Sequence, residues 1–321
     1  METNKIDKKK IKGQKTGLVL GSGAARGFSQ IGVIKALVEK DIFIDIIVGT
    51  SVGAIVAACY AKLVDKKDFK GTMTGDGWSR IFQIANLDLD AMFRGFADEK
   101  KITEWLKTAI GDISFDQLAL PMAVVAADAQ TGEEVVIKEG SVLKALKASI
   151  SVPVLFPPVK YGDRYLVDGA FANPVAVEVA KDMGATYIIA CDTTRTREEK
   201  KVTDVKEKLL KGIDQQNKKF MRNAVGMKKT LKKFVNTKLV NTATVNAFER
   251  RRNIDRNILR MFRALKQTLN NIEAEVVKSQ LLQADLVITP NVGHIDMMAF
   301  SKGKEAVIEG YNAATKALSK L

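Results

Sequence analysis

The chain of 321 residues is poor in histidine and cysteine, and this narrows the chemistry that it can support. It contains one histidine, His294, and two cysteines, Cys59 and Cys191. The cysteines lack the spacing of metal ligands, so we expect buried, reduced thiols, no metal site and a cytoplasmic location. If the protein uses a nucleophilic serine, the group that accepts its proton is either His294 or a carboxylate.

Long apolar runs and a secretory signal are also absent. No apolar run approaches the roughly 18 residues that a transmembrane helix needs. Residues 1–16 are rich in lysine and have no apolar core, so they are not a signal peptide, and we expect a disordered basic leader. The 46% apolar and 27% charged residues are typical of a soluble globular protein with a sizeable core.

Acidic residues are scarce in one long segment. Residues 195–266 hold 22 Lys and Arg against 7 Asp and Glu, an excess of 15, whereas the whole chain carries +14, so the remainder is close to neutral. Glycine and proline nearly vanish across 195–283, and apolar residues recur sparsely. This pattern predicts an inserted segment of basic amphipathic helices. Such charge asymmetry indicates an anionic partner: a membrane surface or, with weaker support because no nucleic-acid fold signature is present, a nucleic acid.

The stretch 42–61 predicts a strand, a sharp turn and a buried helix. The first part is β-branched and aromatic, the last part is rich in alanine, and Gly49-x-Ser51-x-Gly53 lies between them. Glycines without Cβ atoms permit such a reversal, which strains the apex residue and exposes its side chain at a helix N-terminus. We therefore predict that Ser51 is a nucleophile, although the pattern also occurs in ordinary tight turns.

The rest of the chain alternates between strands and helices. We expect further strands at 17–20, 121–127, 134–138, 165–167, 186–190 and 285–289, and further helices at about 28–38, 102–110, 141–150, 175–183 and 304–318. This order predicts an α/β fold with a mostly parallel central sheet and helices on both faces. The expected catalytic domain comprises 17–194 and 284–321, and 195–283 is the insertion.

The glycine loop after the first strand has two interpretations. Successive backbone N–H groups between Gly21 and Gly27 would form a pocket for negative charge. A dinucleotide site would require an acid at the end of the second strand, whereas Asp45 lies inside that strand. An oxyanion hole is favoured because Ser51 follows the neighbouring strand, with Arg26 positioning the loop or adding positive potential.

A second candidate group is the carboxylate of Asp168. It ends a predicted strand and precedes the small residues Gly169 and Ala170, which suits an acid at the edge of a cleft. An aspartate in a turn is, however, common by itself.

Three motifs together resemble the patatin-like phospholipase family: Gly21-x-Gly23-x-x-Arg26-Gly27, Gly49-x-Ser51-x-Gly53 and Asp168-Gly169-Ala170, in this order. The similarity covers roughly 17–179 and 285–318. It implies a three-layer α/β fold and a Ser-Asp dyad that acts on acyl esters of lipids without a catalytic histidine or a cofactor.

The resemblance assigns a role to each matching position. Ser51 would be the nucleophile, Asp168 the base, and the backbone of Gly23 and Ala24 the oxyanion hole. Ser22 and Ala24 stand where many members have glycine, which leaves the donor N–H groups of the loop to be established.

Three functions therefore compete. The first is a lipid acyl hydrolase, similar to phospholipase A or lysophospholipase, that forms an acyl-enzyme. The second is an α/β-hydrolase-type esterase that uses His294, which lies in a polar loop after a strand. The third is a membrane or nucleic-acid binding module without catalysis. In the first case, 195–283 would hold a peripheral enzyme on an anionic membrane; the sequence predicts no oligomeric state.

Overall fold

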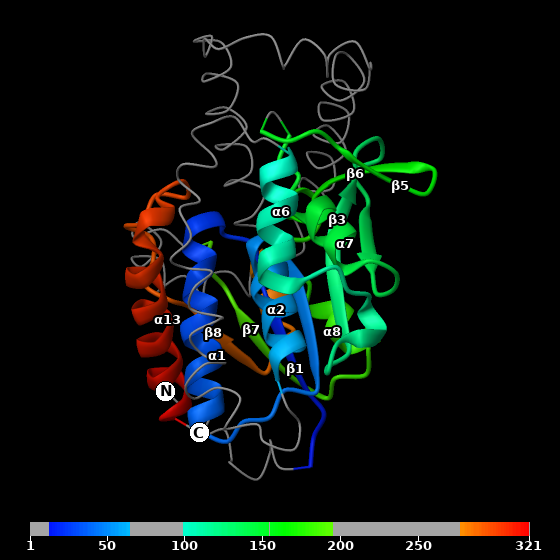
Figure 1. The fold of residues 1–321 in the computed structure, drawn as a ribbon. Helices are drawn as coiled ribbons and strands as arrows, with labels where there is room; N and C mark the ends of the chain where they lie inside the picture. Colours follow the sequence, from blue (N-terminus) through cyan, green and yellow to red (C-terminus); the bar gives the residue numbers. More distant parts are fainter. Residues whose placement is uncertain (1–12, 65–98, 154, 195–276, 321) are drawn as a thin grey trace, which may run out of the picture.

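The computed structural model describes residues 13–64, 99–153, 155–194 and 277–320, which form an α/β fold (Figure 1). Their eight strands make one sheet in the order β5-β6-β3-β2-β1-β7-β8, with β4 also paired to β3. The strands are β1 Thr16–Leu20, β2 Ile46–Thr50, β3 Met122–Asp128, β4 Glu134–Ile137, β5 Val159–Tyr161, β6 Arg164–Asp168, β7 Tyr187–Cys191 and β8 Leu286–Ile288.

The sheet is parallel in its middle and antiparallel at one side. The pairings between β3, β2, β1, β7 and β8 are all parallel, whereas β4 and β6 run antiparallel to β3 and β5 runs antiparallel to β6. Successive side chains enter different cores, as Leu18 and Val19 do. The parallel strands are therefore covered on both faces, which explains their almost continuous apolar sequences.

Helices cover both faces of the sheet. The larger core receives side chains from α1 Ser29–Glu39, α2 Val52–Leu63, α6 Glu99–Ile110, α7 Val142–Ser149 and α13 Gly303–Leu318. The smaller core receives side chains from α8 Val177–Asp182 and from residues 277–281. Helices α1 and α13 lie side by side (Figure 1), and a Cβ atom at Gly310 would overlap the carbonyl of Ser29. The predicted three-layer α/β architecture is confirmed.

Two elements begin later than the sequence predicts. The sequence places the start of β2 near Ile42, but the strand starts at Ile46, which pairs with Gly17 of β1. It continues through Gly49 to Thr50, which pairs with Val125 of β3. Helix α8 starts at Val177 rather than directly after Pro174. The carbonyl of Pro174 instead accepts a hydrogen bond from the Ser22 amide at 2.8 Å, which holds this segment against the glycine loop.

The described residues also bear on the expected domain limits. Thr16, assigned to the leader, is buried in β1. Val277 and Leu281, assigned to the insertion, are buried in the smaller core, so that core includes residues before 284. Residues 1–12 and 195–276, which make up most of the expected leader and insertion, lie outside the described residues. Among the helices that are described, none is both long enough and apolar enough to cross a membrane.

Candidate active site

Ser51 lies at the apex between β2 and α2 and has the strained backbone expected there. Its φ of 56° and ψ of −129° are unfavourable for a residue with a Cβ atom. A Cβ atom at Gly49 would overlap the backbone of Ala54, and one at Gly53 would lie 2.6 Å from the carbonyl oxygen of Gly21. Both flanking positions must therefore be glycine, because the backbone passes too close for a side chain. The turn between β2 and α2 consists of Ser51 alone.

The hydroxyl of Ser51 donates to Asp168 Oδ2 at 2.7 Å. The two residues come from separate elements, since Asp168 ends β6 and pairs with Ala126 of the intervening strand β3. Ser51 is only 7% exposed, so the expected exposure of its side chain is wrong, and Asp168 is 2% exposed. The other carboxylate oxygen accepts the Ala170 amide at 2.8 Å, and a Cβ atom at Gly169 would overlap the carbonyl of Val125. The Asp-Gly-Ala motif therefore holds the buried carboxylate of Asp168 in an orientation that faces Ser51.

Burial also changes the acidity of this carboxyl group. It raises the pKa of Asp168 from an ordinary value of 3.8 to about 7, against the hydrogen bonds from the Ala170 amide and the Ser51 hydroxyl, which lower it. Desolvation disfavours the charged form of an acid. Asp168 is consequently a stronger base than an exposed aspartate and is matched to proton transfer near neutral pH.

A second serine, Ser149, contacts the turn of residues 49–53, which we call the elbow. The Ser51 amide donates to Ser149 Oγ at 2.8 Å, and Ser149 Oγ donates to the Val125 carbonyl at 2.6 Å. Ser149 continues the buried stripe of α7 formed by Val142, Ala145 and Leu146. A hydroxyl on a buried apolar stripe must find partners, and this signal could have identified Ser149.

Most amides of the glycine loop are used inside the fold. Four of them donate to backbone carbonyls at 2.8 to 3.3 Å, those of Gly21, Ser22, Ala25 and Arg26. In the described part of the chain, the amides of Gly23 and Ala24 have no such partner. Ala24 adopts a left-handed φ of 47°, which glycine would adopt without strain. The amides of Gly23 and Ala24 are those that the family resemblance assigns to the oxyanion hole.

The loop also touches the elbow directly. A Cβ atom at Gly27 would lie 3.0 Å from Val52 Cγ1, and Gly21 lies against Gly53 as described above. A Cβ atom at Gly23 would overlap Thr193 Oγ1. These contacts place both ends of the loop against the residues that flank Ser51.

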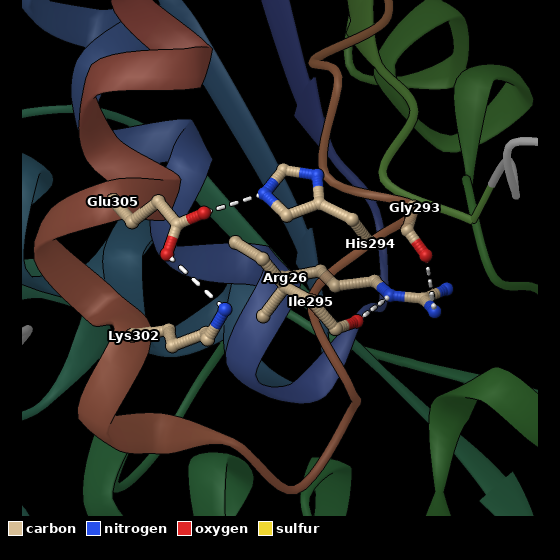
Figure 2. Close-up of polar contacts among 6 residues, drawn as sticks. All are labelled: Arg26, Gly293, His294, Ile295, Lys302 and Glu305. Carbon is tan, nitrogen blue, oxygen red and sulfur yellow. Dashed lines mark hydrogen bonds and ion pairs between the residues drawn. The ribbon is translucent and has the colours of Figure 1, made fainter.

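Arg26 anchors the loop to the segment before α13. Its Nε donates to the carbonyl of Ile295 at 2.7 Å, and its Nη2 donates to the carbonyl of Gly293 at 3.5 Å (Figure 2). Of its two expected roles, the geometry thus supports positioning of the loop.

His294 lies between these two anchoring residues but points elsewhere. Figure 2 shows its ring directed at Glu305 of α13, where Nε2 and Glu305 Oε1 are 2.6 Å apart. Lys302 approaches the other oxygen of Glu305 at 3.4 Å. The structure therefore pairs Ser51 with Asp168 and pairs His294 with Glu305.

A dinucleotide site would need an acidic residue at the C-terminal end of β2, and Asp45 does not lie there. Asp45 accepts the Thr16 amide at 2.8 Å and precedes β2, at the opposite end of that strand from Ser51. Over the described ranges, no group of three or more His, Cys, Asp or Glu side chains could hold a metal ion. Cys59 and Cys191 are both free and buried, as predicted.

Comparisons with known proteins identify the family of this chain. A model of the family described as patatin-like phospholipase matches residues 18–181, about half of the chain. An uncharacterised NTE family protein of Mycobacterium tuberculosis is 32% identical over 189 residues, which cover 59% of this chain and 32% of that protein. Patatin-like phospholipase domain-containing protein 7 of Mus musculus is 31% identical over 191 residues, which cover 57% of this chain and 14% of that protein.

Among solved structures, VipD from Legionella pneumophila aligns with 95% of this chain and 67% of its own, at 15% identity and a TM-score of 0.47. The chain spans a third or less of the two curated relatives named above. With the family model matching half of its length, this chain belongs to the patatin-like phospholipase family.

Proposed function

We propose that the protein is a serine acyl hydrolase that cleaves fatty-acyl esters of lipids, similar to phospholipase A or lysophospholipase. The observation that carries the proposal is the hydrogen bond of 2.7 Å between the strained elbow residue Ser51 and the buried carboxylate of Asp168. Membership of the family supports lipids as the substrate class. His294 has Glu305 as its partner, so the geometry gives no support to a histidine-dependent esterase.

The first half of the reaction forms an acyl-enzyme. Asp168 accepts the proton of the Ser51 hydroxyl while the serine oxygen attacks the ester carbonyl carbon. The free amides of Gly23 and Ala24 donate to the resulting oxyanion. When the tetrahedral intermediate collapses, the ester C–O bond breaks, and the leaving alcohol takes the proton from Asp168.

The second half releases the fatty acid. Asp168 removes a proton from a water molecule, which attacks the acyl carbon and forms a second oxyanion in the same loop. Collapse of this intermediate breaks the bond to Ser51, which recovers its proton from Asp168. One oxyanion-hole donor contributes about 10²- to 10³-fold in rate, so the two loop amides would add to the acceleration that proton transfer to Asp168 provides.

The test is hydrolysis of a lipid panel by wild type and Ser51→Ala. We expect release of fatty acid by wild type and loss of activity in the variant with an unchanged circular dichroism spectrum. Ser29→Ala is a matched control, because it also removes one buried serine hydroxyl but leaves the elbow intact. Undiminished turnover by folded Ser51→Ala would exclude the serine mechanism.

We further propose that the basic segment 195–283 binds an anionic membrane surface and brings the enzyme to its substrate. Its support is the excess of 15 positive charges between 195 and 266. Basic residues near an anionic surface each contribute about 1 kcal/mol of binding energy, screened by salt.

A further inference from the structure

Ser149 has a buried hydroxyl group that donates one hydrogen bond and accepts another. Its side chain is 0% exposed and lies at the C-terminal end of α7. The single hydroxyl proton donates to the Val125 carbonyl at 2.6 Å, which leaves the oxygen lone pairs for the Ser51 amide at 2.8 Å. The hydroxyl therefore links the backbone of the nucleophile to the neighbouring strand β3 in one orientation.

The link acts at a residue with a strained backbone. Ser51 has a φ of 56°, and strained backbone of this kind persists only when surrounding contacts hold it. The preceding residue, Thr50, pairs with Val125 in the sheet. Ser149 thus continues the hydrogen bonding between β2 and β3 by one residue, to Ser51, which lies just beyond the end of β2.

The same end of α7 also contacts the other half of the dyad. The carbonyl of Ser151 accepts the Asp168 amide at 3.0 Å, and Ser151 is two residues from Ser149. The segment 149–151 therefore holds the backbone of Ser51 through a side chain and the backbone of Asp168 through a carbonyl. A displacement of one half relative to the other would change the 2.7 Å contact between Ser51 Oγ and Asp168.

We infer that Ser149 is a positioning residue of the reaction, which fixes the Ser51 backbone so that its hydroxyl meets Asp168. This inference rests on the proposed serine mechanism. Because the Ser51 amide is engaged by Ser149, that amide does not serve the oxyanion, which agrees with Gly23 and Ala24 as its donors. Ser149 does not touch the reacting atoms and acts only through Ser51.

The experiment compares Ser149→Ala with Ser149→Cys and with the control Ser141→Ala. Cysteine fills the site but makes weaker hydrogen bonds, so it provides a graded change. Ser141 caps the opposite end of α7, where its hydroxyl accepts the Lys144 amide at 3.2 Å, so its loss weakens the same helix far from the dyad. The measurements are kcat and KM on a soluble nitrophenyl ester, the pH profile, and the rate of labelling by an alkyl fluorophosphonate.

We expect kcat of Ser149→Ala to fall by about 10²-fold, the size of effect seen for a small misplacement of reacting groups, with little change in KM. The kcat of Ser149→Cys should lie between those of Ser149→Ala and wild type, and the rate of labelling should fall in the same order. The hydrogen bond from Ser51 lowers the pKa of Asp168, so loosening it should move the acidic limb of the profile to higher pH. Ser141→Ala should keep both kcat and the position of that limb.

Wild-type kcat in folded Ser149→Ala, or equal losses in Ser149→Ala and Ser141→Ala without a shift of the acidic limb, would overturn the inference. If Ser149→Ala does not fold, Ser149→Cys decides by the same two readouts. Ser51→Ala is measured in parallel: activity in that variant would refute the serine mechanism, whereas its loss together with an unaffected Ser149→Ala would refute only the role of Ser149.

Discussion

At the scale of single residues, the burial of Asp168 favours its proposed role as a base but lowers the stability of the folded protein at neutral and alkaline pH. Between its ordinary pKa of 3.8 and its folded value of about 7, the folded protein holds a proton that the unfolded chain has released. The contribution of this group to stability therefore decreases as the pH rises through this window. Under the proposed mechanism, activity should change in the opposite direction, because only the carboxylate form of Asp168 can accept the Ser51 proton.

The first prediction concerns the pH dependence of the wild type. Its kcat/KM should rise with an acidic limb near pH 7, the pKa that burial gives to Asp168. A pH series on a soluble ester, whose own chemistry does not titrate in this range, measures the limb. An acidic limb near pH 4 would show that Asp168 titrates like an exposed aspartate.

The second prediction is that Asp168→Asn is inactive but more stable above pH 7. The amide oxygen can still accept the Ala170 amide, but the side chain neither takes a proton nor carries a buried charge. A shift of about three pKa units corresponds to roughly 4 kcal/mol of unfolding free energy, which is an upper limit for the gain. Denaturant unfolding at pH 5 and pH 8 measures it, and a variant less stable than wild type at pH 8 would contradict the assigned cause.

The third prediction concerns two adjacent positions of the glycine loop. Gly23→Val should lose at least the 10²- to 10³-fold that one oxyanion donor contributes, because its Cβ atom would overlap Thr193 and move the loop. Ala24→Gly should keep activity, because glycine adopts the φ of 47° without strain. Normal kcat for Gly23→Val on a short ester would show that this loop does not build the oxyanion hole.

At the scale of elements, the glycine loop is held by segments that are distant in the sequence. The carbonyl of Pro174 accepts a hydrogen bond from the Ser22 amide, and the carbonyl of Met297 accepts one from the Ala25 amide. Arg26 adds its bonds to the carbonyls of Gly293 and Ile295. Rigid support of this kind keeps catalytic donors in place.

The fourth prediction contrasts two neighbours in this network. Arg26→Met should lower kcat by about tenfold or more, because the loop loses its side-chain anchor. His294→Ala should leave kcat near wild type, since the anchoring carbonyls belong to the backbone and the ring contacts Glu305. Steady-state kinetics on one ester compares both variants. If His294→Ala lost activity while Asp168→Asn kept it, the Ser-Asp pair would be the wrong mechanism.

The sequence predicts local patterns well and tertiary contacts poorly. Apolar periodicity and the three motifs predict the α/β order, the strained Ser51 and the Asp168 strand end, because each depends on neighbouring residues. The late starts of β2 and α8 could not be predicted, because they depend on the pairing of Ile46 with Gly17 of β1 and on the contact of Pro174 with Ser22. Ser149 was missed for the same reason, since its partners lie in two other elements.

At the scale of the whole molecule, the charge is concentrated away from the catalytic residues in the sequence. The excess of 15 positive charges in 195–266 compares with +14 for the entire chain. The rest of the chain is thus close to neutral. In the membrane proposal, binding and chemistry belong to different parts of the chain.

The fifth prediction tests this separation by charge reversal in the basic segment. Changing several of its lysines to glutamate should weaken flotation with anionic vesicles, more strongly at low salt than at high salt. Turnover of a soluble short-chain ester should hardly change. The lysines to reverse are Lys218, Lys219, Lys228, Lys229, Lys232 and Lys233.

Ser51→Ala is the matched control for vesicle binding, because it leaves the charge unchanged. Equal flotation by wild type and the charge-reversed protein at low salt would refute membrane binding by this segment and leave the hydrolase proposal untouched.

The most direct test of the serine mechanism is the site of covalent labelling by an alkyl fluorophosphonate, located by peptide mass spectrometry. Attack of the Ser51 oxygen on phosphorus expels fluoride and leaves a stable adduct. The Ser51–Asp168 pair predicts one adduct, on the peptide that contains Ser51, with loss of activity in proportion to labelling. The adduct should be absent from Ser51→Ala and should form more slowly in Asp168→Asn. An adduct on a different residue that inactivates the enzyme, or unchanged labelling of Ser51→Ala, would contradict the assignment of Ser51 as the nucleophile.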